Sequence, residues 1–150
     1  MIINIFEDKS IICELDDSLP VLRHRWKHAM EGPPFRNYLL RVLEEYKKLK
    51  HSYSMLAWLA DTTLLGELDE ETEVWLVDVW EDLLFAQREV KIHAVILGNS
   101  IYADYPMENF KQDAEQKFED FDVHLGVFSN QHDAYVWIRE QQLAIARNAN

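Results

Sequence analysis

The pattern of apolar and polar residues predicts short strands in the first part of the chain. Two β-rich runs, residues 2–6 and 10–15, are separated by a short polar break, which is typical of a hairpin. In residues 22–28 the basic side chains occupy one parity, and apolar side chains together with His24 occupy the other. This alternation indicates a strand with one solvated face. We expect the three runs to form an antiparallel meander.

From residue 32 onward, helical and strand patterns alternate. Prolines at positions 33 and 34 are tolerated in the first turn of a helix, and apolar residues then recur every three or four positions. The runs 54–60 and 91–97 are mostly apolar, which suits strands buried on both faces of a sheet. The remaining predicted elements are helices over 69–86, from 106 and from 130, and a strand over 121–128.

This order, βββαβαβαβα, predicts one α/β domain over residues 1–150. Strands that alternate with helices imply parallel strands joined by right-handed crossovers. We therefore expect a mixed sheet that begins with the antiparallel meander, continues with parallel strands and is flanked by helices. The composition agrees, because 48% of the residues are apolar and 12% are aromatic, which is enough to supply a packed core.

The helix predicted over residues 69–86 has an unusually wide apolar face. On a helical wheel its apolar residues cover well over half of the circumference, whereas a surface helix needs only about 100° of apolar arc. We expect the helix to be covered on two sides, by a neighbouring helix of the same domain or by a dimer partner. The candidate interaction face consists of Trp75, Val79, Trp80 and Leu83.

Charge is unevenly distributed along the chain, whose formal net charge is −12. Such an acidic protein is a poor ligand for nucleic acid, which attracts proteins mainly through phosphate neutralisation. Basic residues predominate between positions 20 and 51, while residues 61–82 contain nine acids and no base. These segments form either two solvated faces or the opposed patches of a molecule that associates with itself or with a basic partner.

The expected absence of membrane-spanning and signal segments, together with the single cysteine, favours a cytoplasmic protein. No apolar run approaches the roughly 18 residues that a transmembrane helix needs, and the first residues resemble a strand more than a signal peptide. Cys13 is the only cysteine, so no internal disulfide can form, and its apolar neighbours predict an unreactive thiol. We expect no transmembrane segment.

The chain lacks the common motifs of enzymes. Its four glycines are scattered, so neither a dinucleotide-binding loop nor a P-loop is present, and no nucleophile elbow occurs. We expect His24 and His28 to be ordinary surface or interface histidines and not metal ligands. These absences predict a protein without catalytic residues, cofactor or metal.

One loop is the candidate switch or ligand site. Asp61, Thr62 and Thr63 follow a strand predicted to be central, and ligand sites in open α/β sheets gather at the carboxyl ends of strands. Glu73 lies within the apolar arc of the next helix. Its carboxylate is either held in a pocket with a raised pKa, as in a general acid, or bonded to backbone N–H groups or solvent, which is the more common arrangement.

Four motifs carry a resemblance to a known family: Trp26 at the end of the third strand, residues 58–61, Glu71-x-x-x-Trp75 and Ala134-x-x-Trp137-Ile138. Their order and spacing resemble the STAS superfamily, the fold of anti-sigma-factor antagonists, and more narrowly its small stand-alone bacterial domains. The resemblance implies a non-enzymatic module that docks partners. It also implies a switch by phosphorylation after the central strand, where Thr62 and Thr63 match.

Together these observations predict a non-catalytic regulatory or protein-interaction domain that self-associates. Its partner is either a second copy, giving a homo-oligomer (a dimer), or another protein. The alternative is a carrier of a small molecule or lipid, because helix-flanked sheets can hold an apolar ligand and this chain is rich in aromatic residues. A third alternative is an enzyme that uses Glu73 or Asp61.

Overall fold

The computed structural model describes residues 1–87, 89–97, 112, 116–117 and 123–148. Its strands are β1 (Ile2–Glu7), β2 (Ile11–Asp16), β3 (Val21–Trp26), β4 (Ala57–Asp61), β5 (Ile92–Ile96) and β6 (His124–Phe128). Its helices are α1 (Gly32–Leu49), α2 (Glu70–Trp75) with its continuations η1 (Leu76–Trp80) and η2 (Asp82–Ala86), and α4 (Gln131–Asn148). The helix predicted from residue 106 and the start of the strand predicted over 121–128 lie outside the described residues.

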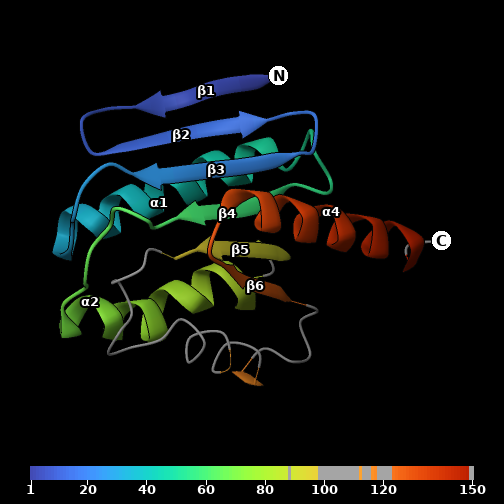
Figure 1. Cartoon of the computed structure of the whole chain (residues 1–150). Coiled ribbons are helices and arrows are strands. Elements are labelled where there is room, and N and C mark those ends of the chain that lie inside the picture. Colours follow the sequence, from blue (N-terminus) through green and yellow to red (C-terminus); the bar gives the residue numbers. More distant parts are fainter. Residues whose placement is uncertain (88, 98–111, 113–115, 118–122, 149–150) are drawn as a thin grey trace.

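The six described strands form one mixed sheet whose spatial order follows the chain, from β1 to β6 (Figure 1). β1, β2 and β3 pair antiparallel, while β3, β4, β5 and β6 pair parallel. This confirms the predicted fold class, an antiparallel meander followed by parallel strand–helix units. It also places the carboxyl ends of β3, β4, β5 and β6 at one edge of the sheet.

Helices cover both faces of the sheet. Helix α1 and the helix formed by α2, η1 and η2 pack on one face with Trp58 and Ala60 of β4. Helix α4 packs on the opposite face with Ala57 and Leu59 of the same strand. The alternation of side chains along β4 therefore distributes its residues between two separate cores.

Among the described residues, the largest differences from the predicted strand boundaries are at the start of β4 and the end of β3. The segment 54–56 belongs to the turn after α1, because the N–H groups of Ser52 and Tyr53 donate to the carbonyl of Leu49 and shape the return of the chain. β3 ends at Trp26, so His28 is outside the strand and bonds to Ser10 instead. In both places the apolar or alternating sequence pattern is longer than the strand itself, before the start of β4 and after the end of β3.

The helix after β4 begins as predicted at Asp69, whose carboxylate accepts the N–H of Thr72 at 3.1 Å. From Leu76 it changes to π-type hydrogen bonding, in which the N–H of Glu81 donates to the carbonyl of Leu76, five residues earlier. A π turn contains one residue more than an α turn, so it shifts the faces of the helix. None of the described helices has the length and apolar character needed to cross a membrane.

Candidate functional site

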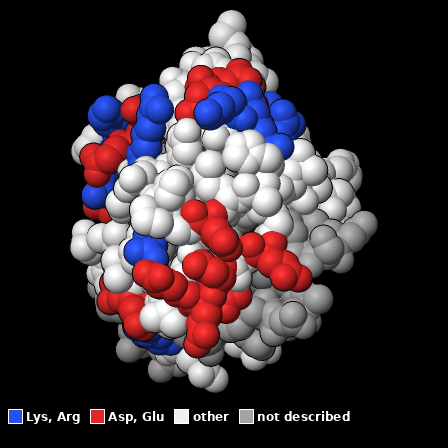
Figure 2. All heavy atoms as spheres, turned by 90° about the vertical axis from the view of Figure 1, so that its left-hand side faces the viewer, with Lys and Arg blue, Asp and Glu red and all other residues white. Residues whose placement is uncertain are grey.

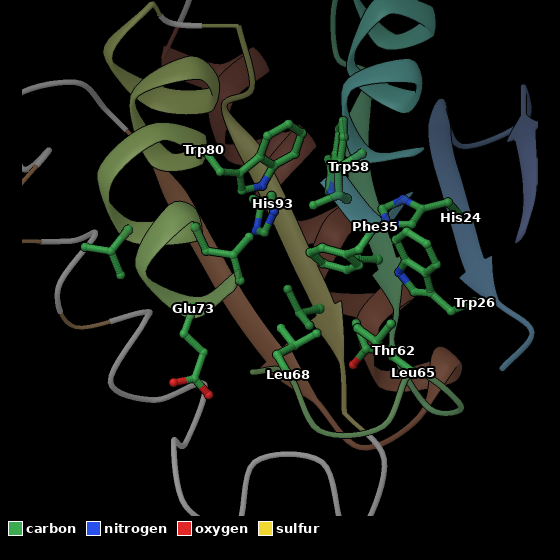
Figure 3. Close-up of a pocket in the computed structure, with 15 residues that line it drawn as sticks. His24, Trp26, Phe35, Trp58, Thr62, Leu65, Leu68, Glu73, Trp80 and His93 are labelled. Carbon is green, nitrogen blue, oxygen red and sulfur yellow. The ribbon is translucent and has the colours of Figure 1, made fainter. Parts of the chain in front are cut away.

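A cavity of about 60 Å³ lies between the sheet and the helices α1 and α2–η1 (Figure 3). Strands β3, β4 and β5 form its floor, α1 contributes Phe35 and Leu39, and the loop after β4 and the helix beginning with α2 close its remaining sides. Most of the side chains that line it are aromatic or aliphatic. The cavity is thus an apolar space at the carboxyl edge of the parallel strands.

Three rings from three adjacent strands stand in a row beneath this cavity. Trp58 of β4 is paired directly with His93 of β5. His24 of β3 is paired with Ala60, which lies two residues after Trp58 and on the same face of the sheet. The centroid of the Trp58 ring is 5.3 Å from that of His24, in an edge-to-face arrangement. It is 6.0 Å from that of His93, which stacks on it.

Both histidines are buried and uncharged at neutral pH. Their exposed fractions are 1% for His24 and 4% for His93. Burial lowers the pKa of both imidazoles to about 3, and the proximity of His93 contributes further to the shift of His24. The expectation that His24 is a surface or interface histidine is therefore wrong. His24 lies in the middle of a strand, on the face that α1 covers.

The ring of His24 differs from the buried side chains of Tyr46 and Gln142 in its hydrogen bonding. Neither of its nitrogens has a hydrogen-bond partner among the residues that the structure describes. By contrast, the buried hydroxyl of Tyr46 donates to the carbonyl of Leu56 at 2.6 Å, and the amide of Gln142 donates to three carbonyls. Buried polar groups in native proteins are nearly always paired, so the environment of His24 requires an explanation.

The mouth of the cavity is formed by the loop after β4 and the first turns of the helix (Figure 3). Leu65 and Leu68 lie at this end, and the carboxylate of Glu73 points away from the aromatic residues. The loop is attached to the connection between β3 and α1, since the N–H of Met30 donates to the carbonyl of Leu65. Next to this bond, Gly66 (φ +80°) approaches Ala29 so closely that an added Cβ would lie 2.9 Å from the Ala29 Cβ.

The predicted loop residues point to opposite sides of the sheet. Thr62 is 5% exposed and lines the cavity, and its hydroxyl donates to the carbonyl of Ile96 at 2.6 Å. Asp61 lies on the α4 side, where it accepts the hydroxyl of the exposed Thr63 at 2.6 Å. Only Thr62 of the three therefore belongs to the aromatic cavity.

The residues predicted as an interaction face are divided between core and surface. Trp80 is 3% exposed and packs against Trp58, while Val79 is 42% exposed. Trp75 stacks on Trp80 and is half-buried, as is Leu83. The wheel that grouped them assumed a regular α-helix, and the π turns at residues 76–80 and 82–86 change that grouping.

Acidic side chains surround the mouth. Figure 2 views the side of the molecule toward which β3 and β4 point, and it shows a cluster of carboxylates across the lower half of this face. Exposed acids near the cavity are Glu67, Asp69, Glu70 and Glu71. One of them, Glu71, pairs with Arg36 of α1 at 3.3 Å. The rim is thus negative, whereas the interior is neutral.

The described residues provide no metal centre, since no three of their His, Cys, Asp and Glu side chains are grouped as ligands. Cys13 is buried under α1, and burial raises the pKa of its thiol to about 12. This agrees with the unreactive thiol expected from its apolar neighbours.

Searches against protein-family models, curated proteins and solved structures find no match to this chain. The fold itself defines the class, a mixed-sheet α/β domain with an apolar cavity at the carboxyl edge of its parallel strands. Sequence patterns contained a signal for both histidines: His24 shares its parity with Leu22 and Trp26, and His93 interrupts an apolar run. The cavity above them had no such signal, because it depends on how the helices meet.

Proposed function

We propose that this chain is a non-catalytic binding domain that takes a small, uncharged and mostly apolar molecule into the cavity beneath α1 and α2. The observation that carries this proposal is a cavity of about 60 Å³ within an otherwise buried aromatic core. Protein interiors are normally close-packed, and an unfilled apolar space forfeits dispersion contacts. A ligand that fills the space restores them.

The position of the cavity supports a binding role. It opens at the carboxyl ends of β3, β4 and β5, where open α/β sheets place their ligands. Its lining is aromatic and aliphatic with a few polar groups, which is the usual composition of a small-molecule site. The acidic rim disfavours anions, and an apolar interior disfavours ions of either sign.

The ionisation of the site supports binding over catalysis. A general acid or base works best when its pKa is close to the working pH. The pKa values of His24 and His93, at about 3, are far from neutrality. The carboxylate of Glu73 points away from the cavity. No described group in the cavity therefore combines the position and the pKa that proton transfer near neutral pH requires.

Titration with 1-chlorobutane, followed by methyl NMR, tests this proposal. We expect shifts of the methyl groups of Leu65 and Val95, which line the cavity, and none for Leu59 or Ile138 on the α4 face. Ala60→Leu, which fills the cavity, abolishes the shifts, whereas Leu143→Ala on the outer surface of α4 leaves them unchanged. Absence of cavity-specific shifts in the wild-type protein contradicts the proposal.

A second candidate function is self-association or docking of another protein through the helix that follows β4, as the STAS-like resemblance implies. The observation that favours it is the exposure of two valines on this helix, 51% for Val74 and 42% for Val79. A regulatory role would combine both functions, with the occupied cavity altering the helix that contacts the partner.

Sedimentation at several protein and salt concentrations tests this second function. We expect concentration-dependent association that Val79→Asp weakens at least tenfold. Val136→Asp is the matched control, because Val136 on α4 is similarly exposed at 46%. A strict monomer at all concentrations, or equal weakening by both substitutions, removes the proposal of an interface at this helix.

A further inference from the structure

The imidazole of His24 identifies the polar group that the cavity can accept. A neutral imidazole carries one N–H donor and one lone-pair acceptor. In His24 neither nitrogen has a hydrogen-bond partner among the described residues, and the side chain is 99% buried, since only 1% is exposed. The ring lies on the wall of the cavity, edge-on to Trp26 and Trp58. The wall of the apolar cavity therefore contains a buried imidazole without a hydrogen-bond partner among the described residues.

We propose that the ligand carries a hydroxyl group that bonds to the ring of His24, so that the site selects uncharged aliphatic alcohols; this inference rests on the binding function proposed above. A hydroxyl both donates and accepts, and so it pairs with either ring nitrogen in either tautomer. An ammonium can only donate and a carboxylate can only accept. Both are also charged, which the apolar interior penalises.

Thr62 provides a second polar contact of the same kind. Its hydroxyl lines the cavity and already donates its proton to the carbonyl of Ile96. The oxygen of Thr62 keeps lone-pair capacity, so it can accept the proton of a bound hydroxyl. Thr62, directly after β4, is therefore a second polar group in the lining that can accept a proton from a ligand.

The volume limits how much of a ligand is enclosed. A cavity of about 150 Å³ binds benzene in another protein, and the space here is about 60 Å³. It accommodates the hydroxyl group and the first few carbons of an unbranched chain. Further carbons extend toward the mouth, where Leu65 and Leu68 provide apolar contacts. The alcohol thus enters with its hydroxyl group first.

Three isosteric probes test the inference: 1-butanol, 1-chlorobutane and butyrate. Affinities are measured by methyl NMR titration, and the ring nitrogens of His24 are followed in protein labelled with 15N-histidine. We expect 1-butanol to bind at least tenfold more tightly than either of the others and to shift a ring nitrogen of His24. The nitrogens of His132, at the exposed start of α4, stay unchanged.

The variant His24→Phe keeps an aromatic ring of similar width and removes both nitrogens. We expect it to bind 1-butanol and 1-chlorobutane equally. The 15N shift in the wild-type protein tests the same bond without any substitution, should this variant fail to fold. Equal binding of both probes by the wild-type protein, or binding of 1-butanol without a shift at His24, overturns the hydroxyl inference and leaves the binding function intact.

A different result contradicts the binding function itself. If neither 1-butanol nor 1-chlorobutane produces shifts at the methyl groups around the cavity, no small apolar molecule enters it. Water alone at His24 would give a ring-nitrogen signal that none of the probes changes. This outcome overturns the hydroxyl inference, and together with unchanged methyl groups around the cavity it also overturns the binding function.

Discussion

The two faces of the sheet are built from the same strands but are packed in opposite ways. On the α4 face, small and aliphatic side chains of the sheet, such as Ala94, pack against Ala134 and Ile138 of a single helix. The packing there is tight: a Cβ added to Gly126 would lie 2.6 Å from the ring of Phe128. On the other face, tryptophans and histidines lie under two helices and a loop, and a cavity remains.

The contrast shows that the two faces of one sheet are packed by different kinds of side chain. The α4 face has fully buried Ala94, Ala134 and Ile138, and the smaller cavity on this face, of about 40 Å³, is lined mostly by charged and polar side chains. Three elements that meet over large, flat rings cannot fill every gap, and the gap lies where α1, α2 and the loop after β4 converge. If this interpretation is right, substitutions and pH changes should affect the two faces differently.

We expect the largest effect from acidification, which should lower the free energy of unfolding through the two histidines buried on the cavity face. His24 and His93 have pKa values of about 3 when folded and about 6.5 when unfolded. Below pH 6.5 these histidines bind protons in the unfolded chain but stay neutral in the folded chain. The free energy of unfolding therefore falls progressively between pH 6.5 and 3. At pH 5 the expected loss is about 2 kcal/mol for each histidine relative to pH 7.5.

Urea unfolding at a series of pH values measures this loss. His24→Phe should remove about half of it, because only His93 then remains protonatable in this core. A wild-type protein with equal stability at pH 7.5 and pH 5 would show that the two rings are not buried together in neutral form.

Matched alanine substitutions compare the packing of the faces directly. Ala94→Val adds two methyl groups to the close-packed α4 face and should cost about 1–3 kcal/mol. Ala60→Val adds the same atoms beside the cavity and should be neutral or stabilising by up to about 1 kcal/mol. Thermal unfolding of the two variants gives the comparison, and equal destabilisation would contradict it.

Thr72 joins the two helices above the cavity. It is fully buried, and its hydroxyl oxygen accepts the N–H of Gly32 at the start of α1 at 3.0 Å. Thr72→Val preserves the shape but leaves that N–H without its acceptor, at a cost of about 1 kcal/mol. Thr72→Ser retains the oxygen and should keep this bond. Chemical denaturation of both variants, with amide exchange at Gly32, separates the bond from the lost methyl group.

The smallest expected effect concerns Cys13, whose thiol should not react in the folded protein. The thiol of Cys13 is buried, and its pKa is raised to about 12, so the folded protein should not react with a disulfide reagent at pH 8 within minutes. The same protein in denaturant should react completely. Rapid labelling of the folded chain would show that the core beneath α1 opens readily.

The sequence was sufficient for the fold because the strands alternate so regularly. The parity of β3 placed Trp26 and the arginines on opposite faces, and the apolar runs located β4 and β5 with small errors at their ends. Local hydrogen bonds decide those ends, as in the turn after Leu49. The period of two can be recognised even when the ends of a strand are misplaced, because side chains alternate between the two faces along the whole strand.

The site was less predictable, since it depends on geometry that no local pattern records. The rule about carboxyl ends of strands pointed to residues 61–63, and of these three only Thr62 lines the cavity. Val79 and Trp80 were grouped on one face, but the π turns moved Val79 outward and Trp80 into the core. His24 had the right parity for burial, yet a histidine without partners is too unusual to expect from sequence.

Gly66 affects how fast a ligand could enter and leave the cavity, because it lies in the loop at the mouth. The loop can shut against Ala29 only because no side chain stands between them, and one backbone bond from Met30 to Leu65 holds it there. A molecule that enters or leaves the cavity passes this loop. The residence time of a ligand would therefore depend on how often this loop opens, and a larger residue at position 66 would shorten that time without touching the ligand.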